Sequence, residues 1–311
     1  MSYLISIVIL FVVGGVSFFI WRILKKVRLG RALNLRLISI RLPQKLKPEE
    51  QPKDFKDELN LSAQLYGILS GLKSPFALEA AVHHIGEEIH FYAAVPKESV
   101  EAVSRQIEGL WKDAQVEPAP DFNIFNPAGA STGIFIQQKL SYALPLRTYV
   151  EANVDTFAPI LSGLSKINEI GEGMAIQILA RPAPSSAKKS ISQMISNLKK
   201  GKKIDEVLKG AAIGFKDVQK AISPTETKKK EKEEKVIDEE AIKTLESKIM
   251  KPLLAVNLRV IALAPVKYQA EALLESASSS FSQFSAPLRG IENHKTEECS
   301  KADLPVFFPG I

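Results

Sequence analysis

A charge-free apolar run near the N-terminus constrains this 311-residue chain more than any other feature. The run extends from Tyr3 to Trp21 and consists mainly of Ile, Val, Leu, Phe and small residues. About 20 such residues are what an α-helix needs to cross a bilayer, and a helix satisfies its own backbone polar groups there. The alternative is a helix buried in a protein core. The sequence predicts a transmembrane anchor over residues 1–24.

The residues that follow favour the membrane interpretation and set an orientation. Five cations come at once, with no acidic residue among them, and they are the candidates for contact with anionic lipid: Arg22, Lys25, Lys26, Arg28 and Arg31. The flank rich in Lys and Arg stays in the cytoplasm, so we expect the N-terminus outside and the body cytoplasmic. A cleaved signal peptide would need its positive charge before the run and a small-residue cleavage site after it. We therefore expect an uncleaved anchor.

Residues 25–58 are expected to form a basic juxtamembrane segment and a spacer rich in Pro, Lys, Glu and Asp. Within them, Leu33–Leu42 alternates loosely and fits either a strand or a continuation of the N-terminal helix. The single cysteine, Cys299, excludes an internal disulfide framework and agrees with a reducing compartment. The roughly 290 remaining residues allow one large or two modest domains.

The first half of the folded body is expected over residues 59–184. Its periodicity predicts, in order, a helix from Leu59, strands over 76–82 and 88–95, a helix opened by Pro96, strands over 116–120 and 133–144, a helix over 156–167 and a strand over 174–180. This order predicts an α+β fold with a mostly antiparallel sheet. Ferredoxin-like topology is our leading expectation.

A short internal repeat predicts a second half over residues 238–290. The segment Ile89–Pro96, a strand that leads into a helix, has a counterpart in Leu258–Pro265. A strand that delivers a Pro-started helix is a common unit, so chance similarity is the alternative. We interpret the pair as two related ferredoxin-like half-modules. The sequence leaves open whether they share one sheet.

Between the halves, residues 185–237 are expected to form an exposed insertion. Ser185–Leu198 has a helical period, whereas Thr225–Lys235 alternates Lys and Glu, has no apolar residue to bury and is interpreted as part of a disordered linker. Residues 291–311 show no clear period and are interpreted as a tail.

No catalytic constellation stands out. The nearest approach to a P-loop is Gly67–Ser74, where Leu72 occupies the position in which that motif needs Gly before the Lys. His83 and His84 are adjacent, so on a strand they point to opposite faces and cannot chelate a metal together. No Ser lies in a Gly-x-Ser-x-Gly elbow, and Ser278–Ser280 fits the polar face of a helix. We expect no enzyme activity, no cofactor and no metal.

Six lysines around the predicted helix over 185–198 make it the most cationic part of the body. These candidate phosphate-contact residues are Lys188, Lys189, Lys199, Lys200, Lys202 and Lys203. Three interpretations compete: a solvated helix face, contact with anionic lipid near the anchor, and contact with nucleic-acid phosphates. No aromatic residue interleaves with these lysines, so base stacking finds no support.

Several short motifs follow the anchor, the basic run and the spacer in a familiar order. They are Pro75–Glu79, Glu88–Pro96, Pro145–Tyr149, Gly171–Ile178 and Arg181–Pro182. The arrangement resembles the membrane-proximal N-terminal region of bacterial conjugation or type IV secretion-like ATPases, in which such a region precedes a DNA-translocase motor. The resemblance covers most of the chain, and its motifs are structural rather than catalytic.

The resemblance implies a single-pass protein of the bacterial inner (plasma) membrane. The family's motor domain should begin after the second half-module, and this sequence stops at Ile311, so we expect either a fragment or a stand-alone anchor. Its partners would be membrane lipid, a P-loop ATPase in trans, DNA and further copies of the chain. We expect a non-enzymatic membrane-anchored domain that positions a DNA-translocation ATPase. The alternatives are a membrane-tethered nucleic-acid-binding module that uses the lysines of 188–203, and a membrane-associated hydrolase with scattered catalytic residues.

Overall fold

The computed structural model describes residues 6, 13–23, 34–42, 55–72, 74–83, 88–120, 124, 128–138, 141–146, 155–165, 167, 170–204, 206–208, 238–284 and 291–295. Residues 13–23 are helical. The other elements are β1 (Leu35–Arg41), α2 (Phe55–Ser70), β2 (Phe76–Val82), β3 (Ile89–Pro96), η1 (Lys97–Ser99), α3 (Val100–Leu110), β4 (Gln115–Pro118), β5 (Ala130–Gln138), α5 (Ala158–Leu164), β6 (Gly173–Pro182), α6 (Ser185–Lys199), α8 (Glu239–Met250), β7 (Leu254–Ala264), α9 (Lys267–Ser279), η2 (Ser280–Phe284) and β8 (Ile291–Lys295).

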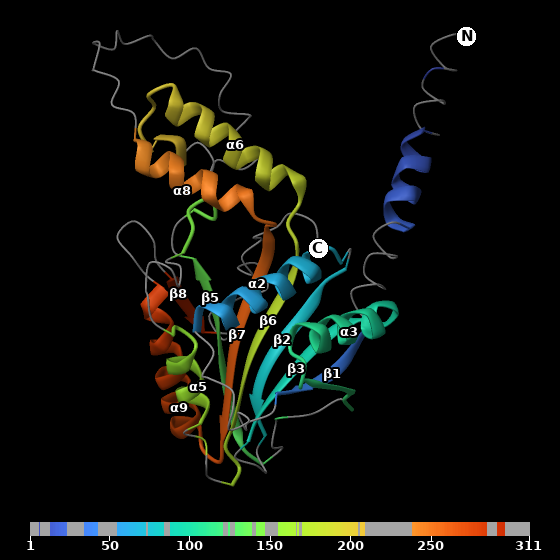
Figure 1. Ribbon diagram of the computed structural model, residues 1–311, viewed down its shortest axis with the longest axis vertical. Helices are drawn as coiled ribbons and strands as arrows, with labels where there is room; N and C mark the ends of the chain where they lie inside the picture. Colours follow the sequence, from blue (N-terminus) through green and yellow to red (C-terminus); the bar gives the residue numbers. More distant parts are fainter. Residues whose placement is uncertain are drawn as a thin grey trace.

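The described strands form one eight-stranded sheet in the order β4-β1-β3-β2-β6-β7-β5-β8 (Figure 1). Every neighbouring pair is antiparallel. The prediction of an α+β fold with a mostly antiparallel sheet is confirmed. An all-antiparallel sheet can leave one face without helices, and this sheet does so among the described residues.

The sheet consists of two groups of four strands with the same connectivity. In chain order each group runs strand, helix, strand, strand, helix, strand, apart from α6 and α8, which are inserted between the second and third strands of the second group. Each group lines up its fourth, first, third and second strands across the sheet. The groups join through their second strands, β2 and β6, where Glu79 lies opposite Gln177. The repeat falls on the third strand of each group: Ile89–Pro96 is β3, and Leu258–Pro265 covers the end of β7 and the residue that follows it. The two groups therefore share one sheet.

The described helices of both groups pack on the same face of the sheet. Phe76 contacts the cluster of α2 and α3, while Ala80 and Val82 on the same strand contact the cluster of α5 and α9. Residues two apart on a strand share a face, so these three side chains point one way. Glu79 and Ala81 point the other way. We call this opposite side the helix-free face, because the cluster of described residues on it contains no helical residue.

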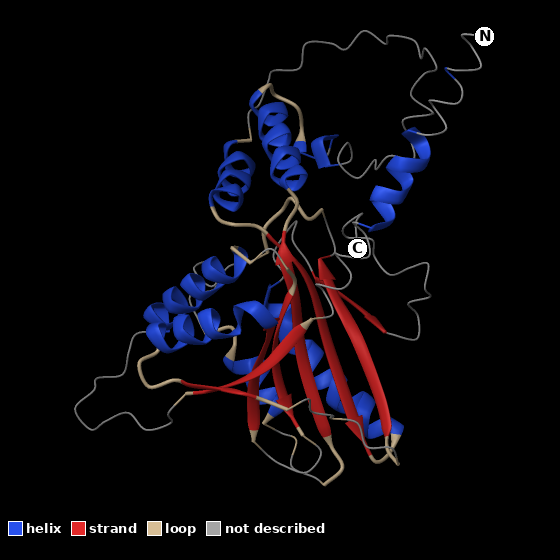
Figure 2. Ribbon diagram, turned by 90° about the vertical axis from the view of Figure 1, so that its right-hand side faces the viewer, coloured by secondary structure: helices blue, strands red, loops and turns tan. Residues whose placement is uncertain are grey.

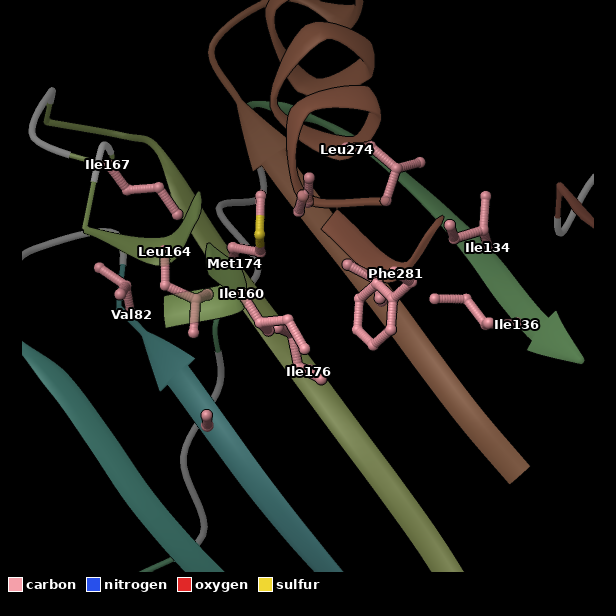
Figure 3. Close-up of a cluster of buried hydrophobic side chains, with 14 residues drawn as sticks. Val82, Ile134, Ile136, Ile160, Leu164, Ile167, Met174, Ile176, Leu274 and Phe281 are labelled. Carbon is pink, nitrogen blue, oxygen red and sulfur yellow. The ribbon is translucent and has the colours of Figure 1, made fainter. Parts of the chain in front are cut away.

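The larger apolar cluster lies under α5 and α9 (Figure 3). Ile160 and Leu164 of α5 point down onto Met174 and Ile176 of β6, and Leu274 and Phe281 cover β7 and β5. Apolar residues that alternate along the strands form one side of this core, and apolar residues at helical spacing form the other. The second cluster repeats the arrangement under α2 and α3.

Helices α6 and α8 form an insertion between β6 and β7, at the place that a tight hairpin turn would occupy. The helix pair projects beyond one end of the sheet (Figures 1 and 2). It has its own apolar cluster, which includes Ile191, Leu198, Ile242 and Leu245. The insertion thus packs as a unit beside the sheet.

Several boundaries differ from the sequence-based expectation. The segment that fitted either a strand or a helix is strand β1, and α2 begins at Phe55, inside the expected spacer. Strand β5 ends at Gln138 rather than at residue 144, because Leu144 N–H donates to the Ser141 carbonyl and closes a turn. Strand β8 lies in the segment interpreted as a tail, and it gains its order by pairing with β5.

Half of the predicted anchor over residues 1–24 lies outside the described residues, which here are 6 and 13–23. Within the part of the chain that is described, no helix is both long enough and apolar enough for a membrane crossing. The Lys/Glu stretch Thr225–Lys235 and Cys299 also lie outside the described residues.

Candidate functional site

The six predicted phosphate-contact lysines lie on α6 and in the turn after it. Lys188 and Lys189 are near the start of the helix, Lys199 is its last residue, and Lys200, Lys202 and Lys203 follow. All six are exposed. Because a helix rises about 1.5 Å per residue, Lys189 and Lys200 lie about 16 Å apart along the axis. The structure therefore gathers the lysines into two groups, one at each end of α6.

The two groups share one side of the helix. Helix α6 buries Ile191, Met194, Ile195 and Leu198. Eleven residues make slightly more than three turns, so Lys189 and Lys200 are rotated by only about 20° from each other, and both point away from the buried stripe. Lys188 and Lys199 have the same spacing and border them. We call the side formed by Lys188, Lys189, Lys199 and Lys200 the lysine face.

A glycine turn holds the group at the carboxyl end. Gly201 has a φ of 83°, which glycine adopts without strain, and its N–H donates to the Leu198 carbonyl at 2.8 Å. The Lys202 N–H donates to the Asn197 carbonyl at 3.2 Å. The turn keeps Lys200 and Lys202 beside the negative end of the helix dipole, which favours cations.

The charge is distributed unevenly over the inserted helix pair. From Ser185 to Lys203 there are six lysines and no acidic residue, whereas α8 with its N-cap has more acids than lysines. An ion pair between the two helices joins Lys199 Nζ and Glu246 Oε1 at 2.7 Å, and both side chains are exposed. Exposed pairs contribute little to stability. One side of the insertion is therefore cationic and the other is not.

Helix α8 attaches the insertion to the rest of the body. Lys248 Nζ donates to the backbone carbonyls of Tyr142 and Leu144, the second at 3.0 Å, in the segment that follows β5. Ala143 and Leu144 also belong to the apolar cluster of the insertion. Burial lowers the pKa of Lys248 to about 8. Since α8 contacts the body, α6 is the outer helix of the pair, as Figure 1 also shows.

Of the predicted lipid-contact cations, Arg22 is described and exposed, at the end of the helix over 13–23. Lys25, Lys26, Arg28 and Arg31 lie outside the described residues. The large apolar side chains of this helix are all between 47% and 63% exposed: Val13, Val16, Phe18, Phe19, Ile20, Trp21 and Ile23.

The P-loop-like segment Gly67–Ser74 ends a helix instead of opening one. Ser70 Oγ donates to the Gly67 carbonyl at 2.6 Å, and Gly71 N–H donates to the Ile68 carbonyl at 3.0 Å. Phosphates bind at helix N-termini, where N–H groups are unpaired. This segment presents the carbonyl end of α2, and Lys73 lies outside the described residues.

The predicted serine face lies at the end of α9 and the start of η2, and its hydroxyls bond to nearby backbone. The hydroxyls of Ser278, Ser279 and Ser280 each donate to a carbonyl three residues earlier, at 3.1, 2.8 and 2.6 Å. Such bonds to the helix's own backbone are ordinary for helical serines.

Sequence reasoning missed a polar row on the helix-free face. Gln177 Nε2 donates to Glu79 Oε1 at 2.6 Å, and an Arg259 guanidinium nitrogen lies 3.4 Å from Gln177 Oε1. The same guanidinium lies 5.5 Å from the centre of the Phe135 ring. Register places these four residues side by side across β2, β6, β7 and β5. The row joins the two halves of the sheet through side chains.

A second polar group lies next to this row, at the hairpin between β2 and β3. His83 Nε2 and the Tyr92 hydroxyl are 3.0 Å apart, and the rings of His83 and His90 lie 4.9 Å apart. Burial raises the pKa of Tyr92, with the Arg41 charge lowering it and the Glu79 charge raising it. His84 lies outside the described residues. The described part of the chain contains no group of three or more His, Cys, Asp or Glu side chains that could hold a metal ion.

Comparison with known proteins does not connect this chain to a family. No protein-family model matches the sequence, and a search of curated proteins finds no related sequence.

Proposed function

We propose that this chain is a non-enzymatic, membrane-anchored module that positions a DNA-translocation ATPase of the type IV secretion kind. In this proposal residues 1–24 cross the bacterial inner membrane, the body is cytoplasmic, and the ATPase is a separate protein. Holding a partner at a surface raises its effective concentration without any chemistry.

The exposed apolar helix over residues 13–23 carries the anchor part of the proposal. Its large side chains, from Val13 to Ile23, lie outside every apolar cluster of the body. A helix that is apolar on all sides needs either a protein core or lipid around it. Lipid is the partner that the following cations also favour.

The finer fold assignment belongs to the same proposal. We infer that each half of the sheet is a ferredoxin-like unit; the strand order and connectivity support this, with the helix pair α6 and α8 in place of one hairpin turn in the second half. In this proposal the two units, β1 to β4 and β5 to β8, are joined through β2 and β6 into a rigid platform. A rigid platform is what a positioning function requires.

The ATPase part of the proposal rests on the resemblance of short motifs. Three of them, Pro75–Glu79, Glu88–Pro96 and Gly171–Ile178, fall largely on the neighbouring strands β2, β3 and β6. The likeness is therefore concentrated at the centre of the sheet.

A pull-down from host membranes tests this function. Tagged full-length protein is solubilised in detergent, and the partners are identified by mass spectrometry. We expect recovery of a P-loop ATPase. A matched control replaces residues 1–24 with an unrelated single-pass segment, which should recover the same ATPase because the body makes the contact.

Two outcomes would contradict the proposal. One is that the full-length protein recovers no more P-loop ATPase than the unrelated single-pass segment does when it is expressed without the body. The other is ATP hydrolysis by the purified chain that falls in Lys73→Ala, which would make the chain itself an enzyme.

A further inference from the structure

The lysine face of α6 has the composition of a surface for an anionic partner. Its exposed positions are Lys188, Lys189, Lys199 and Lys200, with Ser192, Gln193 and Ser196 between them. An ordinary solvated helix mixes both signs of charge, as α8 does. Lys188 and Lys189 also lie near the positive end of the helix dipole, where cations are disfavoured and no acidic residue offsets them. Helix stability therefore does not account for their presence.

The face points away from the body. Helix α8 lies on the inner side, where Lys248 binds the carbonyls of Tyr142 and Leu144, and α6 packs on α8 through its buried stripe. Lys189 and Lys200 lie on the opposite side of α6 from that stripe, whereas Lys188 and Lys199 lie beside it and Lys199 reaches Glu246 of α8. A broad surface can therefore approach all four lysines without meeting the sheet.

The insertion lies at the end of the sheet where the chain arrives from the anchor. Strand β1 begins at Leu35 opposite Pro96, and β6 leads into the insertion at Pro182 opposite Leu254. The registers of β3, β2 and β6 put these two places at the same end. Twelve residue steps separate Ile23 from Leu35, so the sheet end stays within about 40 Å of the end of the apolar helix. Figure 1 shows the helix over residues 13–23 and the helix pair α6 and α8 at this end of the sheet.

We propose that the lysine face binds the anionic lipid headgroups of the membrane that holds the anchor, so that the body has two attachments instead of one. The inference rests on the anchor in the proposed function. Each lysine near an anionic bilayer strengthens attraction by about five-fold. With the anchor as one attachment and α6 as the other, the long axis of the sheet stands at a fixed inclination to the membrane.

A fluorescent probe on the face tests this. Cys299→Ser removes the native thiol, and Ser196→Cys, in the middle of the lysine face, carries an environment-sensitive dye. The full-length protein is reconstituted into vesicles of phosphatidylcholine, with or without phosphatidylglycerol. We expect a blue shift of dye emission only with phosphatidylglycerol, and its loss at 1 M salt, where the screening length falls from about 10 Å to about 3 Å.

A matched pair of variants isolates the face. Replacing Lys188, Lys189, Lys199 and Lys200 with Gln should abolish the shift. Replacing four exposed lysines elsewhere with Gln changes net charge equally and should preserve it: Lys112, Lys243, Lys251 and Lys267.

Three results would overturn the inference: an equal shift in phosphatidylcholine alone, a shift that survives the four changes on the face, or a shift that requires added DNA. Flotation of the protein with phosphatidylcholine vesicles reports the anchor separately. Flotation without a dye response refutes the second attachment and leaves the anchor standing, whereas loss of flotation refutes the anchor and with it this inference.

Discussion

At the level of single residues, Lys248 has an amine whose pKa differs between the folded and the unfolded protein. It is turned inward from α8 to two backbone carbonyls, and burial lowers its pKa from 10.5 to about 8. The neutral amine is therefore present in the folded protein at a pH where the unfolded chain still carries an ammonium group.

This difference predicts a pH dependence of stability. Between about pH 8 and 10.5 the unfolded chain binds the proton more tightly, so Lys248 makes the free energy of unfolding rise with pH in that window. Below about pH 8 both states are protonated, and the group adds no slope. Denaturant unfolding of wild type and Lys248→Met across this range measures the effect. The variant should show a smaller rise, and identical slopes would contradict the assignment.

The polar row shows what residue patterns can and cannot predict. Glu79, Gln177 and Arg259 each interrupt an apolar strand, and strand alternation predicts which neighbours share their face. It does not predict that the three meet, because Glu79 and Gln177 are 98 residues apart and only strand register brings them together. The lysines of α6 were found because their cluster is local in sequence.

At the level of elements, α5 and α9 pack closely at Gly163. A Cβ on this residue would lie 3.4 Å from the Cα and 3.7 Å from the Cβ of Ala277, which is ordinary contact. Small residues let two helices approach in this way. The site has room for one methyl group and for little more.

This geometry predicts opposite effects of two substitutions. Gly163→Ala should be neutral or stabilise by up to about 1 kcal/mol, because alanine favours helix. Gly163→Leu should destabilise by about 1–3 kcal/mol, because it forces α9 away from α5. Thermal unfolding checks both, with Gly109→Ala, where nothing lies within 4 Å, as the control for helix propensity alone. A Leu variant as stable as the Ala variant would contradict the close packing.

Local periodicity predicted most elements but not their partners. The strands at 76–82 and 174–180 follow from alternation of apolar residues, and both are present. Strand β8 was not predicted, because Ile291–Lys295 has only one apolar residue and depends on pairing with β5. The end of β5 was predicted too late in the chain, because the alternation of apolar residues continues into a turn that Leu144 closes.

At the level of the whole molecule, the insertion and the sheet have separate apolar clusters. Strands β6 and β7 pair from Gly173–Leu263 to Pro182–Leu254 without any contribution from α6 or α8. The sheet should therefore close without the insertion.

Replacing residues 183–253 with a short glycine-containing turn tests this independence. A two-residue hairpin turn can join strands that end directly opposite each other, as Pro182 and Leu254 do. We expect the variant to keep the amide protection of β6 and β7 in hydrogen exchange. Loss of protection in β6 would show that the insertion is needed for the sheet.

The junction of β2 with β6 has a consequence during synthesis. All strands of the first half have been made by Pro118, but β6 begins at Gly173 and its pairing with Phe76 requires Ala180. At 5–20 residues per second, roughly 100 residues of translation leave the edge of β2 without its neighbour for about 5–20 s. An apolar strand with an open edge invites pairing with other chains. During this time β2, which becomes a central strand of the finished sheet, is an exposed edge strand of the nascent protein. A ribosome-associated chaperone would protect it most at this stage.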